Sequence, residues 1–336
     1  SQSPPHELEG IFSDTTMLQH LKELDAQVCM LMIDFSPMRA KVIEVLNAWE
    51  IPVKAQLLLP KRANYRLTIK NATEAKQRYT ELKSWASNNK LKFEGMALAI
   101  EPLLEDIRQL QEGRVSLALK AYKRLNEKEV LNNAKRKYQN LIKQMQSDGY
   151  TVDALVYPFS LDAQKEKSEA FQQLTGLIYL EVDRVVPLFY SNYFKGKEGP
   201  SFIISYGNEE RLEAIGLGST GGELPIEGIH TPHPLNWAYL VRDMNLAAQY
   251  ADNLYIYSLE GCIQRGFLKK FALLDWKGGE ELTQKYNTTV ADDVRKNMSS
   301  VLKSLEYPTL LVLGIALVLI LGMIAIWRLL QRLIST

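Results

Sequence analysis

Residues 93–102, FEGMALAIEP, are the stretch that decides the fold. Small and larger apolar residues alternate through residues 96–100, and Glu101 and Pro102 then end the run. This composition suits a strand that is buried on both faces, as in the core of a parallel α/β sheet. A carboxylate directly after such a strand lies at the carboxyl edge of the sheet, where α/β folds keep their chemistry. Glu101 is therefore either a site residue or a solvated cap on the strand.

Seven further apolar runs have the length of buried strands. With residues 95–101, the expected strands lie at residues 28–35, 53–59, 154–159, 185–190, 201–206, 214–218 and 253–258. Helical stretches separate many of them; one starts after Ser36, a candidate N-cap, with Pro37 at its first position. Eight strands alternating with helices predict an α/β fold of the (β/α)₈ TIM-like barrel type. An open doubly wound sheet is the alternative, but no glycine-rich turn follows the first strand.

The barrel is expected at residues 13–280, with one segment before it and three after it. Residues 1–12 are expected to be a disordered or loosely docked lead, and residues 281–306 a polar stalk or a last helix. Residues 113–147 form a long helical insertion in which Lys and Arg greatly outnumber Asp and Glu. This insertion is either a solvated helix on the outside of the barrel or a basic face turned toward anionic lipid or anionic polymer.

The chain ends in an apolar segment. Residues 307–327 are 21 residues without a charge, which is the length that a helix needs to cross a bilayer. Tyr307 and Trp327 lie where an aromatic belt is expected, and residues 328–336 form a short basic tail. We therefore expect a single-pass C-terminal membrane anchor.

The orientation of this anchor follows from its flanks. Arg328 and Arg332 favour a cytoplasmic C-terminus and an extracytoplasmic barrel, and a tail-anchored cytosolic protein is the alternative. The start at Ser1 suggests a removed signal peptide or a piece trimmed from a longer membrane protein.

Charge and cysteine content narrow the function classes. Lys and Arg number 40 against 39 Asp and Glu, so bulk electrostatics do not indicate a nucleic-acid partner. Cys29 and Cys262 offer no metal-ligand spacing, and His230 and His233 have poor spacing for a metal. We expect no metal and no cofactor.

The predicted strand ends gather carboxylates and aromatic rings. The candidate catalytic residues are Glu101, Glu260 and Asp34, and the candidate substrate-binding residues are Tyr157, Asp183, Tyr190, Tyr206 and Trp237. One protonated carboxyl group can give a proton to a leaving oxygen while a second carboxylate acts as nucleophile or base. Sugar rings stack on aromatic side chains. This constellation predicts an enzyme that cleaves a carbohydrate polymer.

Residues 71–102, NATEAKQRYTELKSWASNNKLKFEGMALAIEP, carry a resemblance, together with residues 185–193, VVPLFYSNY. They resemble the chitinase-like glycoside hydrolases of family 18, in which a barrel strand bears a DxxDxDxE motif. Glu101 takes the place of the final Glu, which is the acid in that family, and Glu94 that of the first Asp. Ala97 and Ala99 stand where the family has its two intermediate Asp residues. The resemblance thus implies a glycosidase-like barrel without chitinase activity, in which Glu260 or Asp34 supplies the second carboxylate.

Two other functions remain open. The missing Asp residues and the basic insertion suit a catalytically degenerate barrel that acts as a binding or scaffolding module, with membrane-protein partners. Residues 216–222, GLGSTGG, suit a phospho-substrate enzyme, because such loops bind phosphate through backbone N–H groups in many barrels. Glycines that simply permit a tight exit from the strand are the alternative explanation of this loop.

Overall fold

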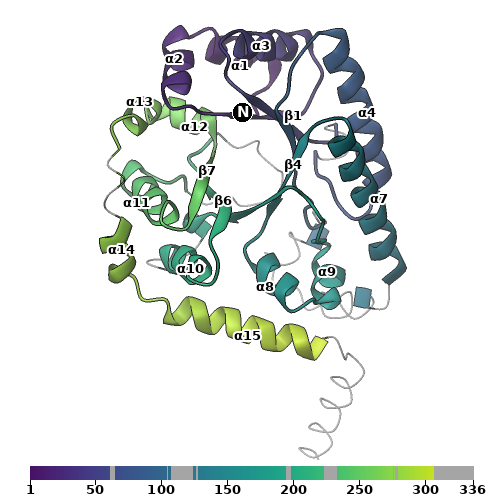
Figure 1. Ribbon diagram of the computed structural model, residues 1–336, viewed down its shortest axis with the longest axis vertical. Coiled ribbons are helices and arrows are strands. Elements are labelled where there is room, and N and C mark those ends of the chain that lie inside the picture. The colour runs from purple at the N-terminus through teal and green to yellow at the C-terminus, as the bar shows by residue number, and fades with distance from the viewer. Residues whose placement is uncertain are drawn as a thin grey trace, which may run out of the picture.

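The computed structural model describes residues 1–60, 65–103, 105–106, 124–125, 128–193, 198–222, 233–274, 276 and 279–305. Its centre is a parallel sheet in which each strand pairs with the next one along the chain (Figure 1). The strands are β1 (Val28–Met32), β2 (Val53–Leu57), β3 (Gly95–Leu98), β4 (Thr151–Val156), β5 (Arg184–Phe189), β6 (Leu212–Gly218) and β7 (Ala251–Tyr257). The predicted α/β class with a parallel sheet is confirmed.

Helices surround this sheet on its outside (Figure 1). In the first half of the chain they are α1 (Pro5–Phe12), α2 (Thr15–Glu23), α3 (Pro37–Ala48), α4 (Ala72–Asn88) and α7 (Lys128–Ser147). In the second half they are α8 (Phe159–Lys165), α9 (Glu169–Thr175), the 3₁₀ turn η2 (Ser191–Tyr193), α10 (Glu198–Gly207), α11 (Trp237–Ala247), α12 (Leu259–Gln264), α13 (Leu268–Phe271), α14 (Gly279–Lys285) and α15 (Thr289–Leu305).

The sheet is curled, so that one face forms an interior and the other meets the helices. Val53, Ala55 and Leu57 of β2 are fully buried on the outward face, as parallel strands under helices require. The alternate residue Lys54 points inward and reaches Tyr255 on β7. Strands at positions two and seven of the sheet therefore face each other across one interior.

The curled sheet is closed by the start of the chain and not by pairing of its edges. No β1–β7 pairing occurs among the described strands. The amino group of Ser1 donates to the carbonyl of Cys29 at 2.6 Å, and the N–H of Leu31 donates to the carbonyl of Ser1 at 2.8 Å. Residues 1–3 thus lie along the free edge of β1, where an eighth strand would begin (Figure 1).

The sequence prediction of eight strands is wrong at residues 201–206. This apolar run, SFIISY, lies inside helix α10, with Phe202, Ile203, Ile204 and Tyr206 all buried. A short continuous apolar run is compatible with a buried strand or a buried helix, and periodicity alone does not separate them. In the folded protein this segment is a helix that packs against α11, α15 and β5.

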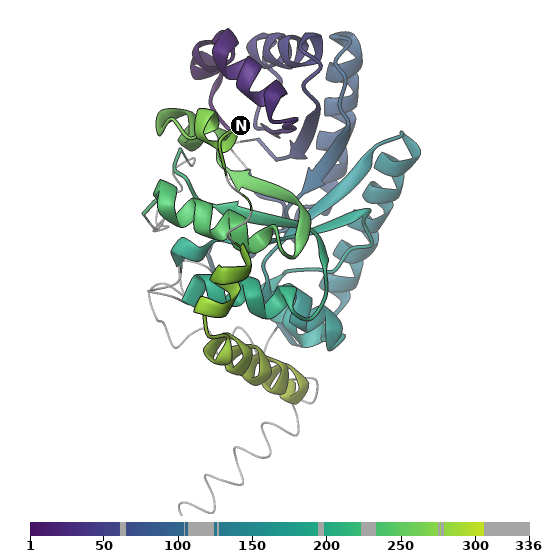
Figure 2. The same cartoon turned by 60° about the vertical axis from the view of Figure 1, so that its left-hand side comes forward.

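The segments before and after the sheet both pack against its covering helices. Helix α1 packs on α3, with Leu8 completely buried. Helix α15, in the predicted stalk, lies against α8, α9 and α10 (Figure 2). Residues 307–327 lie outside the described residues. Within the described ranges, no helix combines the length and the apolar character needed to cross a membrane.

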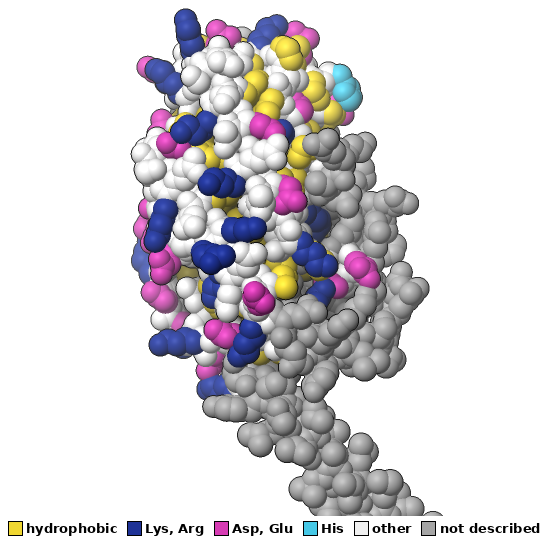
Figure 3. All heavy atoms as spheres, turned by 90° about the vertical axis from the view of Figure 1, so that its right-hand side faces the viewer, with side chains coloured by type: hydrophobic (Ala, Val, Ile, Leu, Met, Phe, Trp, Pro, Cys, Tyr) yellow, Lys and Arg dark blue, Asp and Glu magenta, His cyan; other side chains and the backbone are white. Residues whose placement is uncertain are grey.

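The described part of the long basic insertion is helix α7. Its buried side includes Leu131, Tyr138, Leu141 and Met145, which cover the outside of the sheet. Figure 3 faces this side of the molecule and shows Lys and Arg side chains interspersed with Asp and Glu. The basic face that binds an anionic partner stays a prediction. Residues 107–123 lie outside the described residues.

Candidate active site

An ion pair between Arg66 and Glu101 lies at the carboxyl end of the sheet. Leu67 bridges Ile100 in parallel, and the N–H of Glu101 donates to the carbonyl of Leu67 at 2.8 Å, which places Arg66 beside Glu101. The Glu101 side chain is 24% exposed and that of Arg66 13%. Burial raises the pKa of Glu101, and the positive charge of Arg66 lowers it only in part. The pair is therefore reachable from solvent but held in a weakly hydrated environment.

Tyr157 and Tyr190 lie near the charge of Glu101, and two further tyrosines stack on Tyr190. Tyr190 stacks on Tyr257, with ring centroids 6.0 Å apart, and on Tyr193, at 6.3 Å. Burial raises the pKa of Tyr157 and of Tyr190, and the nearby charge of Glu101 adds to both shifts. Tyr157 is 41% exposed and Tyr193 60%. We call these residues the mouth cluster: Arg66, Glu101, Tyr157, Tyr190, Tyr193 and Tyr257.

A second polar group lies deeper in the interior. Lys54 of β2 and Asp153 of β4 form a buried ion pair, and the hydroxyl of Tyr255 on β7 donates to the same Asp153 oxygen. The Lys54 ammonium also lies 3.2 Å from that hydroxyl. Each group of this triad is satisfied by the other two, as buried charges require.

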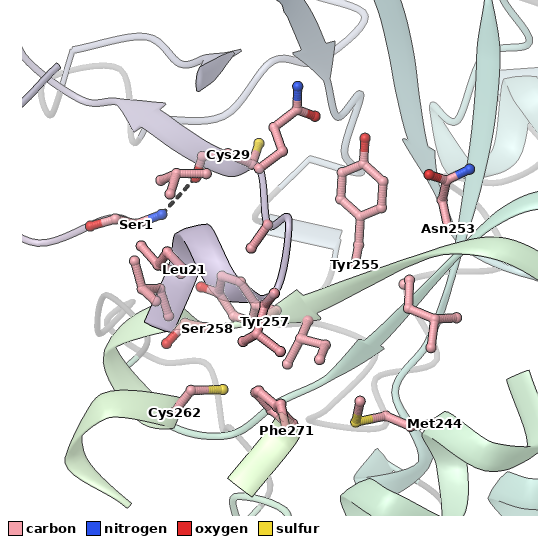
Figure 4. Close-up of a pocket in the computed structure, with 18 of the residues that line it drawn as sticks. Ser1, Leu21, Cys29, Met244, Asn253, Tyr255, Tyr257, Ser258, Cys262 and Phe271 are labelled. Atoms are coloured by element: carbon pink, nitrogen blue, oxygen red, sulfur yellow. Dashed lines mark hydrogen bonds between the residues drawn. The ribbon is translucent and has the colours of Figure 1, made fainter. Parts of the chain in front are cut away.

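A cavity of about 480 Å³ opens between β1 and β7 and continues into the interior (Figure 4). Its walls include Tyr190 and Tyr257 of the mouth cluster and Tyr255 of the buried triad. Both cysteines of the chain, Cys29 and Cys262, line this cavity as free thiols. One cavity therefore reaches residues of both the mouth cluster and the buried triad.

The structure does not join Asp34 and Glu260 to Glu101 as one catalytic group. Asp34 accepts from the Arg39 guanidinium and from the N–H of Ser36, both at 2.9 Å. Burial alone would raise the pKa of Asp34, but these hydrogen bonds hold it below its usual value. Arg66 is the charge that shifts the pKa of Glu101, and neither Asp34 nor Glu260 contributes to that shift.

Glu260 binds the start of the chain. Its Oε1 accepts from the Ser1 hydroxyl and the N–H of Gln2, both at 2.6 Å, and from the N–H of Ser3 at 3.0 Å. Burial opposes ionisation, but the Ser1 amino group and these hydrogen bonds together lower the pKa of Glu260. This carboxylate is a structural anchor for residues 1–3.

Three other sequence-predicted residues lie away from the mouth cluster. Asp183 precedes β5 and accepts from the N–H of Val152 at 2.8 Å, which places it at the opposite, amino end of that strand. Tyr206 belongs to α10 and donates to Asp162 of helix α8, outside the curled sheet. Trp237 packs on Phe267 and Phe271 of the α13 region. Of the predicted site residues, the structure brings together Glu101, Tyr157 and Tyr190.

Three consecutive N–H groups of the glycine-rich loop already have acceptors within the protein. The N–H of Ser219 donates to Asn192, that of Thr220 to the carbonyl of Tyr257, and that of Gly221 to the Ser219 hydroxyl. Gly221 and Gly222 have positive φ angles of 102° and 79°, so they serve the tight exit from β6. The phospho-substrate interpretation of this loop is wrong for that reason.

Sequence reasoning missed several residues of this region. All of them except Arg66 are marked by a pattern in the sequence. Asn253, Tyr255 and Tyr257 alternate along β7, which indicates one shared face. Lys54 and Asp153 are charges flanked on both sides by apolar residues within their strands, which indicates a buried pair. Arg66 is the exception: it lies in a polar loop and gave no signal, because its partner is set by the pairing of Leu67 with Ile100.

No metal site emerges from the described residues, where His, Cys, Asp and Glu form no group of three that could hold an ion. The comparisons with known proteins add the following. No family model matches the chain, and no curated protein matches it.

Two solved structures of sugar epimerases are similar to the chain. One is a D-allulose 3-epimerase from Methylomonas sp., at 11% identity and a TM-score of 0.37, covering 82% of this chain and 91% of that one. The other is a D-psicose 3-epimerase from Clostridium cellulolyticum H10, solved with D-tagatose, at 9% identity and a TM-score of 0.37, covering 86% and 95%. Neither is a glycoside hydrolase of family 18. The expected resemblance is wrong, and so is the predicted membrane-anchored glycoside hydrolase.

Proposed function

We propose that the mouth cluster binds a sugar, either free or at the end of a carbohydrate polymer. The observation that carries the proposal is the partly buried Arg66–Glu101 ion pair beside a group of four tyrosines at the carboxyl edge of the sheet. Barrels of this kind hold their ligands at that edge. In this proposal the sheet acts as a (β/α)₈-type barrel in which residues 1–3 take part of the eighth position.

The tyrosine rings match the apolar C–H face of a sugar, and the charged Arg66 and Glu101 match its hydroxyl groups. Exposed ring faces of Tyr157 and Tyr193 suit the apolar C–H face of a pyranose or furanose. The carboxylate of Glu101 accepts from sugar hydroxyls, and the guanidinium of Arg66 donates to sugar oxygens. Partial burial strengthens these hydrogen bonds, because fewer water molecules compete for them.

The test is a titration of the full chain with a panel of monosaccharides and oligosaccharides, read by calorimetry or ligand-observed NMR. Tyr157→Ala and Tyr193→Ala should each weaken binding by about tenfold, which corresponds to about 1.4 kcal/mol. Tyr239→Ala is the matched control, since Tyr239 is an exposed tyrosine on α11 outside the mouth cluster. Unchanged affinity in both mouth variants would refute the proposal. Preference for oligosaccharides over monosaccharides would identify a polymer end as the ligand.

A second candidate function is proton transfer on a bound carbonyl sugar, favoured by the raised pKa of Glu101. A general base works best when its pKa lies near the working pH. In this scheme Glu101 takes a proton from the carbon next to the carbonyl, and Arg66 stabilises the negative charge that develops on the carbonyl oxygen. The proton can return to the same carbon.

Exchange with solvent tests this scheme. Ketoses and aldoses incubated with the protein in D₂O should gain deuterium at the carbon next to the carbonyl, as seen by NMR. Glu101→Gln should abolish exchange while sugar binding remains, because the amide keeps the shape but cannot accept the proton. Exchange that persists in Glu101→Gln would remove Glu101 from the chemistry.

The predicted membrane span at residues 307–327, its lipid-bilayer partner and the extracytoplasmic placement of the barrel remain our proposal for localisation. Their support is the length and apolar character of that segment.

A further inference from the structure

The inner face of the curled sheet is packed less tightly than its outer face. On β1, Met30 and Met32 belong to the core under the outer helices and are completely buried, whereas Leu31 between them faces inward and is only half-buried. On β5 the same contrast separates Phe189, which is buried against Tyr206 of α10, from Leu188. Side chains normally fill the interior of a barrel of this kind. The inner face of this sheet leaves part of that interior open.

The half-buried inward residues lie around one space. In the register of the sheet, Leu31 lies beside Gln56 of β2, and Gly216 of β6 lies between Leu188 and Tyr255. Neighbours in register share a face, so these residues face the same interior as the buried triad. All of them line the cavity of about 480 Å³, into which Tyr255 points (Figure 4). We call the inward part of this cavity the inner chamber, lined by Leu31, Gln56, Leu155, Leu188, Tyr190 and Tyr255.

Two polar groups of the inner chamber have no hydrogen-bond partner among the described residues. They are the side-chain amide of Gln56 and the hydroxyl of Tyr190, and neither side chain is completely enclosed. The hydroxyl of Tyr255, in contrast, donates to Asp153. An amide offers both a donor and an acceptor. A few such polar groups among apolar and aromatic side chains are typical of a small-molecule site.

The charged residues around the cavity do not offer a counter-charge to a ligand. Asp252 and Arg184 each form an ion pair with a neighbouring residue, and Glu260 binds residues 1–3. Asp25 is exposed to solvent. A charged ligand in the inner chamber would lose its water without gaining an opposite charge, which is unfavourable. The chamber therefore favours an uncharged ligand.

We propose that the inner chamber binds an uncharged planar ring compound that carries a hydroxyl group, such as a naphthol. The faces of its rings pack against the leucine side chains and the tyrosine rings, and its hydroxyl donates to the side-chain oxygen of Gln56. The inference goes beyond the proposed sugar site, because it concerns other side chains, deeper in the sheet, and a different class of ligand.

The experiment titrates the full chain with 2-naphthol and is read by calorimetry. Naphthalene is the matched ligand without a hydroxyl group, and it should bind about tenfold more weakly, which is the value of one hydrogen bond. The anion 2-naphthoate should also bind at least about tenfold more weakly than 2-naphthol, because its charge finds no partner. Absence of 2-naphthol binding, or equal binding of 2-naphthoate, would overturn the proposal.

A variant of Gln56 tests the hydrogen bond. Gln56→Leu keeps the size of the side chain and should bind 2-naphthol and naphthalene about equally. Gln144→Leu, which changes a half-buried glutamine of α7 outside the cavity, should keep the difference between the two ligands. A full tenfold preference for 2-naphthol in Gln56→Leu would refute the role of Gln56.

Cys29 reports whether the ligand lies in the cavity. It lines the cavity as a free, half-buried thiol, and in a Cys262→Ser variant it is the single cysteine. Saturating 2-naphthol should slow modification of Cys29 by a small thiol reagent, and unchanged modification would mean that the ligand binds elsewhere. Tyr157→Ala, which weakens the proposed sugar site, should leave 2-naphthol binding unchanged, so failure of this proposal is distinguishable from failure of the sugar site.

Discussion

Lys54 of β2 and Asp153 of β4 form an ion pair on the inner face of the curled sheet although strand β3 lies between their own strands. The register explains how they meet. Lys54 lies beside Gly95 of β3, and Asp153 lies beside Ala97 of the same strand. Because β3 turns only small residues to the interior at these positions, the two long side chains reach over it. The third partner, Tyr255, arrives from the far edge of the sheet.

Removing the cation of this pair should destabilise the fold strongly. We expect Lys54→Met to lower the free energy of unfolding by about 3 kcal/mol, because it leaves the Asp153 carboxylate buried without a counter-charge. Urea denaturation measures the effect. Lys54→Met combined with Asp153→Leu should recover most of the loss. Lys83→Met, which breaks a more exposed pair with Asp148, should cost less than about 1 kcal/mol. Equal losses in the two single variants would contradict the role of the buried pair.

Gly95 should tolerate no side chain. A Cβ atom there would lie 2.5 Å from the Thr151 hydroxyl and 2.7 Å from its carbonyl oxygen. We expect Gly95→Ala to cost about 1–3 kcal/mol, as for other overpacked sites. The matched control is Gly10→Ala in helix α1, where a Cβ meets nothing within 4 Å and the gain in helix propensity should stabilise by about 0.5–1 kcal/mol. Thermal unfolding of both variants measures these changes in stability. An unchanged stability of Gly95→Ala would contradict the pairing of Gly95 with Thr151 across β3 and β4.

Arg295 should hold helix α15 on the barrel. Its guanidinium donates to Asp162 at 2.8 and 3.0 Å and to the Ser205 carbonyl at 2.8 Å, and it lies 3.8 Å from the Tyr206 ring centre. Arg295→Ala leaves the Asp162 carboxylate buried without a counter-charge, with only the Tyr206 hydroxyl still donating to it. We therefore expect a loss of about 3 kcal/mol and faster amide hydrogen exchange across residues 289–305.

Lys296→Ala is the matched control for this helix, because Lys296 is exposed on the same turn of α15. It should leave the exchange of residues 289–305 unchanged. Slow exchange of this segment in Arg295→Ala would mean that its apolar contacts alone dock it.

Acid should remove the contribution that Asp34 makes to the stability of the fold, because the pKa of Asp34 is lowered in the folded protein. A carboxyl group with a lowered pKa stabilises the fold above its unfolded-state pKa, about 3.9, and this contribution disappears as the pH falls through the folded-state value. The stability difference between the wild type and Asp34→Asn should thus be large at pH 7 and shrink below about pH 4. Unfolding measured from pH 3 to pH 7 checks this.

The contribution of Glu101 to stability should change with pH in the opposite direction, because the pKa of Glu101 is raised. Its stabilising contribution is complete below its unfolded-state pKa and declines as the pH rises through the folded-state value. Glu101→Gln should therefore match the wild type in acid and become the more stable of the two proteins as the pH rises. Parallel pH profiles for the Asp34 and Glu101 variants would contradict the opposite environments of the two carboxyl groups.

Much of the local structure was predictable. The apolar runs at residues 28–35, 53–59, 95–101, 154–159, 185–190, 214–218 and 253–258 each contain much of an observed strand. Ser36 caps α3 through the N–H of Arg39, with Pro37 at the first helical position, as the sequence predicts. The strand prediction failed at residues 201–206, because a fully buried helix and a buried strand present the same unbroken apolar pattern.

The site was predictable only in part. Placing Glu101, Tyr157 and Tyr190 at the carboxyl edge required only that each follows a strand. Asp183 was misplaced because the strand begins directly after it and does not end there. Pairing Glu101 with another carboxylate failed, because Arg66 from a preceding polar loop occupies that place.

The sequence by itself determined the parallel α/β class, most of the strands, and the helix that starts after Ser36, since these depend on residues close together in the chain. Only the tertiary structure decided that the sheet curls around Lys54, Asp153 and Tyr255, that residues 1–3 lie along β1, and that tyrosines and not carboxylates lie near Glu101. The physical reason is distance along the chain. Lys54 lies 99 residues from Asp153 and 201 from Tyr255, so their contact depends on strand order and register, which no local pattern contains.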